Sequence, residues 1–247
     1  FYEGAYQVRP TDRFSDAPLT CYLGPAKGKS LARKQMRGRI TVNTRPFPAV
    51  GYTREDFSRL RAEPHRGAPL AVAREGTCLA IDGRIGNALR IALAPSLHGW
   101  LARDLVDIKP AAPPLGRGTI SNLSVTDSDT TTLVRIPLGL RVPFAVTDRV
   151  EPPSLELTLF GVDNRLDWVV ERGERSFIQT ITTLPATDGS CRFYISVRAK
   201  RLFGFRTYYD GDDFCLVLRH PPKPSSDPSR PLAGRTIVLD PGHGGPS

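Results

Sequence analysis

The sequence contains little of several features that mark particular protein classes. It has one Met, two Trp and four Cys in 247 residues. It has no run of 18 apolar residues, so it predicts no transmembrane helix. Hydrophobic residues make up 40% and charged residues 24%, values that exclude a wholly disordered chain. We therefore expect a folded, globular chain.

The four cysteines are Cys21, Cys78, Cys191 and Cys215. Their spacing is too wide for a zinc knuckle or a Cys-x-x-Cys redox site. Two fall in each half of the chain, which permits one disulfide per half and would suit an exported protein. Four buried thiols are the alternative that the spacing leaves open.

Proline, in contrast, is abundant, with 23 residues against a usual share of about 5%. This favours short strands, turns and linkers over long helices. Pro-rich segments at 110–118 and 221–234 are predicted as linkers between domains. The one Met is Met36, and we expect both ends of the chain to be cuts through a longer protein.

Positive charge gathers in the first half of the chain. The net charge is +9, and residues 1–110 hold 18 Lys and Arg against 10 Asp and Glu. A cluster without an intervening acid could bind an anionic polymer or surface, or could simply be a solvated loop. No recognisable motif points to nucleic acid. The cluster comprises Lys27, Lys29, Arg33, Lys34, Arg37 and Arg39.

Alternating apolar residues predict strands through most of the chain. Residues 155–159 and 191–199 alternate with period two, and residues 119–220 are predicted as an antiparallel β-sandwich. Asp210-Gly211 predicts a hairpin whose register sets Cys215 opposite Arg206. Shorter strands are predicted at 70–74, 77–81 and 89–92. A helix is predicted over 54–62, with Thr53 as its N-cap.

Only a few residues suggest chemistry. The apolar run Ile237-Val238-Leu239 leads into a Gly-rich loop with His243, a place where a zinc ligand would suit, although a plain turn is the alternative. No nucleophile motif or phosphate loop is found. The other candidates are predicted to have structural roles. We expect surface or core positions for His65, His98 and His220, and core positions for Trp100 and Trp168. We expect a turn rather than a calcium site at Asp210, Asp212 and Asp213.

The run from Gly234 to Gly245, GRTIVLDPGHGG, resembles the opening strand and first zinc-ligand loop of the bacterial zinc-dependent N-acetylmuramoyl-L-alanine amidases. The resemblance implies that His243 is a zinc ligand. The family's other two ligands and its catalytic Glu would follow Ser247. By this resemblance the chain contains no catalytic residue and is inactive alone, and zinc belongs to the full-length parent.

Two further resemblances support this reading. Residues 119–220 resemble the AMIN-type β-sandwich that often precedes such amidase domains, through stretches such as TLVRIPL (132–138), LELTLFG (155–161), LDW (166–168) and FGF (203–205). Residues 31–109 resemble a bacterial Src-homology-3-like cell-wall domain, which closes on Gly99-Trp100-Leu101. Residues 1–30 would be the remnant of another β module, and residues 235–247 the first strand and loop of a truncated α/β amidase domain.

The expected fold is therefore mainly β: a small β-barrel-like domain, a β-sandwich and the start of an α/β domain. The expected function is that of a non-catalytic, cell-wall-targeting region of a peptidoglycan amidase. Its partner would be peptidoglycan or an anionic wall polymer, in the periplasm or outside the cell. The alternative is a cell-envelope structural or binding protein with no amidase activity.

Overall fold

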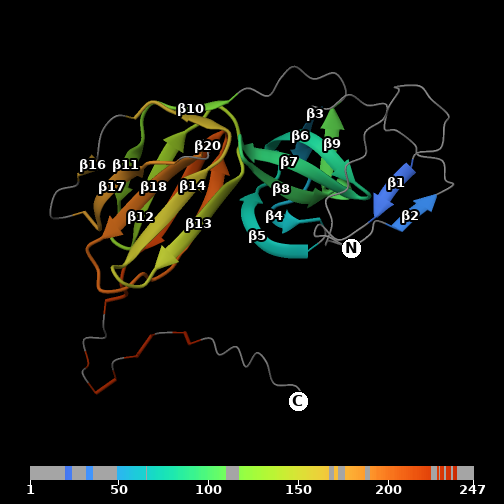
Figure 1. The fold of residues 1–247 in the computed structure, drawn as a ribbon. Helices are drawn as coiled ribbons and strands as arrows, with labels where there is room; N and C mark the ends of the chain where they lie inside the picture. The colour runs from blue at the N-terminus through green and yellow to red at the C-terminus, as the bar shows by residue number, and fades with distance from the viewer. Residues whose placement is uncertain are drawn as a thin grey trace, which may run out of the picture. The chain divides into compact units, whose positions relative to one another are not determined.

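The computed structural model describes residues 49–64, 66–109, 117–166, 176–186 and 190–223, the backbone of 20–23, 32–35 and 170–171, and scattered residues from 227 to 237. The chain divides into two compact units, residues 1–46 and 47–247. In the first unit, strands β1 (Thr20–Leu23) and β2 (Ala32–Gln35) pair in antiparallel fashion. The second unit holds all the other described elements (Figure 1).

Residues 49–109 build a lobe that we call the small lobe. Its strands run in the order β5-β4-β8-β7-β6-β3-β9, all antiparallel, and within the described residues they do not close into a barrel. A single 3-10 turn, Arg103–Leu105, leads into the last strand. The strands are β3 (Ala49–Thr53), β4 (Ser58–Glu63), β5 (Arg66–Ala73), β6 (Cys78–Ile85), β7 (Ala88–Ala94), β8 (Leu97–Ala102) and β9 (Val106–Lys109).

Residues 117–220 build the sandwich lobe. The sheet β11-β12-β20-β19 faces the run β16-β17-β18-β14-β13, and a short parallel pair, β10 with β15, adds to them. The strands are β10 (Gly118–Ile120), β11 (Ser124–Asp127), β12 (Thr131–Pro137), β13 (Phe144–Arg149), β14 (Ser154–Leu159), β15 (Val162–Asn164), β16 (Val170–Glu171), β17 (Ile178–Leu184), β18 (Cys191–Val197), β19 (Phe205–Asp210) and β20 (Asp213–Arg219).

Each lobe buries its own apolar cluster. In the sandwich lobe, side chains from the two facing sheets interleave, as period-two alternation requires. Leu157 of β14, Phe193 of β18 and Phe214 of β20 lie at the centre of this core. The small-lobe core is mostly aliphatic, with Leu60, Leu79 and several others fully buried, and it also takes in Phe160, which follows β14.

The two lobes also share a hydrogen-bonded ladder. Strand β13 of the sandwich lobe pairs with β5 of the small lobe at one position, Phe144 opposite Val72. The prediction of a mainly β, antiparallel fold is confirmed. Among the described residues, no helix is long and apolar enough to span a membrane.

The predicted helix over 54–62 is wrong. The structure has a turn and then strand β4 in its place. The Thr53 hydroxyl, expected to cap the helix, instead binds the carbonyl oxygen of Arg74. Leu60 is fully buried between the neighbouring strands, so sheet packing overrides the local helix signal.

The predicted hairpin forms, but its register is shifted by two residues. The loop is Gly211-Asp212, and Asp210 pairs with Asp213, which sets Cys215 opposite Tyr208 instead of Arg206. Gly211 has φ +61°, which matches a type II′ turn with glycine at the first central position. Arg135 on β12 binds both Asp210 and Asp213, at 2.6 and 2.9 Å. Asp212 thus lies in the turn, and Asp210 and Asp213 lie at the strand ends that the turn joins, in line with the predicted turn.

The described cysteines are free thiols. Cys78, Cys191 and Cys215 form no disulfide, and the alternative of buried thiols holds for Cys191 and Cys215, whereas Cys78 is only half-buried. The Cys21 side chain lies outside the described residues. Burial raises the pKa of the Cys191 thiol to about 12 and also raises the pKa of Cys215. Such thiols are poor nucleophiles because the reactive thiolate is rare near neutral pH.

Candidate ligand-binding groove

Most of the residues singled out from the sequence lie outside the described part of the chain. This applies to His243, His65 and Trp168, and to the basic cluster except for the β2 backbone at Arg33 and Lys34. The strand predicted at 237–239 also lies largely outside it. Within the described residues, no group of three His, Cys, Asp or Glu side chains could hold a metal ion. Another group of described residues, in the small lobe, forms the candidate site.

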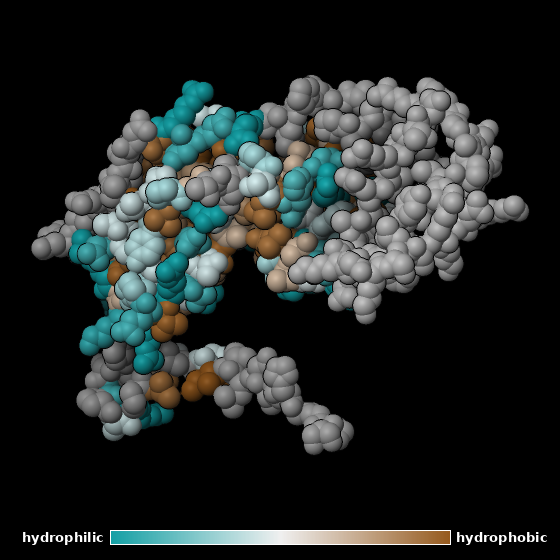
Figure 2. Space-filling view, in the orientation of Figure 1, coloured by the Kyte–Doolittle hydropathy of each residue, from teal (hydrophilic) through white to brown (hydrophobic). Residues whose placement is uncertain are grey.

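The small lobe carries an open groove of about 380 Å³ between the β3–β4 turn, β4 and β8. On the face shown in Figure 2, apolar residues form brown areas separated by teal hydrophilic ones. The residues that give the groove its chemistry are Glu55, Asp56, Phe57, Arg59, Arg61 and Trp100.

Strand alternation points two arginines into this groove. On β4, Ser58 and Leu60 are buried, whereas Arg59 is exposed and Arg61 is half-buried. Arg61 lies directly opposite Trp100 on β8. Because side chains opposite each other on adjacent strands share a face, the guanidinium and the indole line one surface.

A glycine allows these strands to approach closely. A Cβ atom on Gly99 would lie 3.0 Å from the Leu60 Cβ and 3.2 Å from a Leu93 methyl carbon. A residue with a Cβ atom there would require Leu60 or Leu93 to shift by a few tenths of an ångström. Gly99 therefore allows β8 to lie close to Leu60 and Leu93 immediately before Trp100. Trp100 is half-buried there and does not belong to the core cluster, contrary to its prediction as a core anchor.

Phe57 has the most unusual backbone in the groove. Its φ is +58°, and no other described non-glycine residue has a positive φ. A bulky residue in the left-handed region costs about 1–3 kcal/mol and marks a place where the surroundings hold the chain. The ring is 60% exposed. The sequence contained no signal for this strained position, because a phenylalanine rarely occupies it.

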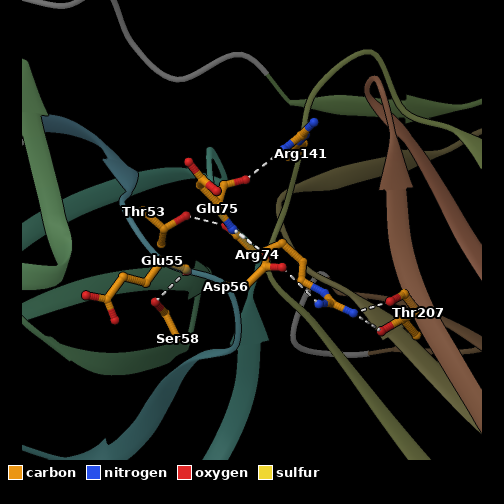
Figure 3. Close-up of polar contacts among 8 residues, drawn as sticks. All are labelled: Thr53, Glu55, Asp56, Ser58, Arg74, Glu75, Arg141 and Thr207. Atoms are coloured by element: carbon orange, nitrogen blue, oxygen red, sulfur yellow. Dashed lines mark hydrogen bonds and ion pairs between the residues drawn. The ribbon is translucent and has the colours of Figure 1, made fainter.

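The buried side chain of Arg74 contacts the turn that contains Phe57. The Arg74 guanidinium carbon lies 3.7 Å from the centre of the Phe57 ring, a cation–π contact. Its Nη1 lies 3.3 Å from the Asp56 carboxylate, and its Nη2 donates to the carbonyl oxygen of Thr207 on β19 (Figure 3). The Arg74 side chain is only 11% exposed. The turn that lines the groove is therefore tied to the sandwich lobe through one side chain.

Two further contacts strengthen this connection between the lobes, which we call the Arg74 joint. The Glu75 amide donates to the Asp56 carboxylate at 3.0 Å. Arg141, between β12 and β13, donates to the Glu75 carbonyl oxygen at 2.8 Å (Figure 3) and to the Gly211 carbonyl oxygen at 2.9 Å. Together they fix the β3–β4 turn and the end of β5 against the sandwich lobe.

A row of polar side chains continues the groove surface along β8. Trp100 lies opposite Arg90 on β7, and the Arg90 Nε binds Asp82 at 2.8 Å. His98 Nε2 lies 2.9 Å from the other Asp82 oxygen. His98 is therefore a partly buried, paired surface residue, as predicted. The second described histidine, His220, lies 2.7 Å from the Thr132 hydroxyl in the sandwich lobe.

The groove can offer a ligand three kinds of contact. Its arginines can bind carboxylates in a bidentate manner, its exposed carboxylates can bind ammonium groups, and its two aromatic rings can cover apolar or sugar surfaces. This combination suits the binding of a ligand that carries charged groups of both signs.

Comparison with known proteins adds no identification. No protein family model, curated protein or solved structure matches the chain.

Proposed function

We propose that this chain is a non-catalytic binding region that holds a peptidoglycan amidase on the cell wall. The observation that carries the proposal is the groove in which Phe57, Arg59, Arg61 and Trp100 meet. Peptidoglycan combines sugar rings with peptides that carry free carboxylates and ammonium groups. The aromatic rings, arginines and carboxylates of the groove complement each of these parts.

The amidase part of the proposal rests on the resemblance of residues 234–245. In it, zinc and the catalytic residues belong to the rest of the parent enzyme, in the cell envelope, and this chain supplies only His243. The basic cluster of residues 27–39 would add an electrostatic contact with the same polymer. The alternative function is a cell-envelope binding or structural protein without amidase activity.

Binding to purified sacculi tests the groove. The double variant Arg59→Gln and Arg61→Gln should lower the affinity roughly tenfold or more, because charge-assisted hydrogen bonds are worth about 1.5–3 kcal/mol each. A control with the same loss of charge is Arg84→Gln with Arg165→Gln, two exposed arginines outside the groove. Retention should also fall as salt rises.

Two outcomes would overturn the binding proposal: no retention of the unchanged chain on sacculi at low salt, or equal retention of groove and control variants. A separate assay tests the amidase part. This chain should neither bind stoichiometric zinc nor hydrolyse peptidoglycan. A gene that continues after Ser247 into an alternating βα domain with a Glu and a His supports the amidase, whereas an early stop codon supports the alternative.

A further inference from the structure

The connection between β18 and β19 gathers exposed phenylalanines and basic residues at one end of the sandwich lobe. We call residues 198–206, RAKRLFGFR, the basic-aromatic loop. Phe203 is 41% exposed and Phe205 is 37% exposed. Lys200, Arg201 and Arg206 are exposed beside them, and the loop contains no acidic residue.

Strand registers show what else lies at this end. Ser196 pairs with Ser154, and the Val197 amide donates to the Pro153 carbonyl oxygen at 3.4 Å, so the loop starts beside the β13–β14 turn. That turn carries Val150, which is 83% exposed. On its other side, the Arg219 amide donates to the Gly204 carbonyl oxygen at 3.0 Å, which adds the exposed Arg219 at the end of β20.

The described acidic residues at this end lie outside the loop. They belong to neighbouring turns and strand ends: Asp127, Asp129, Asp148 and Glu151. Within the loop itself, the apolar side chains therefore lie among basic residues, and the acidic residues lie on its neighbours. Gly204, with φ +92°, allows the sharp bend that sets Phe203 and Phe205 close together in the chain.

We propose that the basic-aromatic loop binds an anionic lipid surface. Phenyl rings and aliphatic side chains partition into the headgroup and acyl boundary of a membrane, while lysine and arginine bind the anionic headgroups. Val150 has neither a ring that could stack on a sugar nor a polar side-chain atom that could bind a peptide, and its exposure favours lipid over a wall polymer. This inference does not depend on the amidase activity or on the groove in the small lobe.

Flotation with lipid vesicles tests the proposal. The full chain should float with phosphatidylcholine vesicles that contain roughly 30 mol% phosphatidylglycerol, and not with phosphatidylcholine alone. Changing Lys200→Gln and Arg201→Gln together should weaken this binding roughly 25-fold, because each basic residue near such a surface contributes about fivefold. The double variant Arg84→Gln with Arg165→Gln is the control, because it loses the same charge outside the loop. It should float as the unchanged chain does.

A second set of variants tests insertion of the aromatic side chain. Phe203→Ala should weaken binding roughly fivefold or more. The matched control is Ile85→Ala, which removes a side chain that is 51% exposed in the small lobe. Phe203→Trp keeps the bulk of the side chain, and its added fluorescence should shift to shorter wavelength with anionic vesicles.

Three results would overturn the proposal. One is no flotation of the unchanged chain with anionic vesicles. Another is equal flotation of Phe203→Ala and Ile85→Ala together with an unshifted Phe203→Trp spectrum. The third is retention on sacculi that the Lys200→Gln and Arg201→Gln changes abolish without affecting flotation, which would assign the loop to the wall polymer. If only the Arg59→Gln and Arg61→Gln changes in the groove reduce sacculus binding, the lipid proposal is unaffected.

Discussion

The two lobes of residues 47–247 differ in how far each supplies its own core. The sandwich core contains Phe144, Phe193 and Phe214, all from its own strands. In the described small-lobe core, the one buried aromatic side chain is Phe160, which comes from the sandwich lobe. The small lobe therefore takes a large apolar side chain of its core from the sandwich lobe. Its groove is also connected to the sandwich lobe, because Arg74, which contacts Phe57 in the groove, binds Thr207 on β19.

The lobes also differ in the surfaces that they expose. The small lobe presents a groove with both signs of charge and two aromatic rings, whereas the sandwich lobe presents basic residues around exposed phenyl rings. A groove of mixed charge suits a ligand of defined shape. The basic-aromatic loop, with its exposed phenyl rings among basic residues, suits a broad surface. Under the two proposals, the groove would bind a wall polymer and the basic-aromatic loop would bind a lipid surface.

Truncating the shared aromatic residue should have the largest effect on this dependence. Phe160→Ala removes a side chain that is 4% exposed and should lower the free energy of unfolding by about 3–5 kcal/mol. Hydrogen exchange should quicken most in β3–β9, although residue 160 belongs to the sandwich lobe in sequence. Exchange that quickens only in the sandwich strands would show that the small lobe holds its core alone. Phe203→Ala, at an exposed position, is the control and should change stability little.

The Arg74 joint should show the next largest effect. Arg74→Met keeps the length of the side chain but leaves the Thr207 carbonyl oxygen without this partner, which should cost about 1–3 kcal/mol in urea unfolding. It should also weaken sacculus binding, because Phe57 loses the guanidinium behind its ring. Arg135→Gln is the contrast: its ion pairs lie within one sheet and near solvent, so a smaller loss is expected. Equal losses would mean that the joint has no special role.

A buried tyrosine should give the smallest effect, and its pH dependence should appear in alkali. The Tyr209 hydroxyl donates to the Val142 carbonyl oxygen at 2.8 Å, and burial raises its pKa well above the ordinary value of 10.0. Its contribution to stability is therefore complete below pH 10 and is lost as the pH rises through the folded-state pKa. Tyr209→Phe should flatten the loss of stability above pH 10.

The control for this effect lies at neutral pH. There Tyr209→Phe should be less stable by about 1 kcal/mol, because the Val142 amide and carbonyl both lose a partner. An unchanged alkaline slope in the variant would mean that other groups carry it, such as Cys191, whose pKa is raised to about 12. Urea unfolding across this pH range distinguishes the two sources.

Part of this structure could be predicted and part could not, for identifiable reasons. Alternation along residues 155–159 and 191–197 predicted strands because a half-buried sheet imposes period two on its own sequence. The helix at 54–62 failed because Thr53 and Asp56 bind Arg74 and Glu75, residues about 20 positions away. The hairpin register shifted because Gly211 took the first, not the second, central position of its turn.

The mainly β character and the alternation of the clearest strands followed from the sequence alone, since period-two patterns depend on neighbours in the chain. The sequence also carried the resemblance on which the amidase proposal depends. Three contacts became visible only in the tertiary structure. Arg61 lies opposite Trp100, Arg74 contacts the ring of the strained Phe57, and Phe160 of the sandwich lobe packs in the small-lobe core. Each of these contacts joins segments distant in sequence, and no local pattern encodes the register that brings them together.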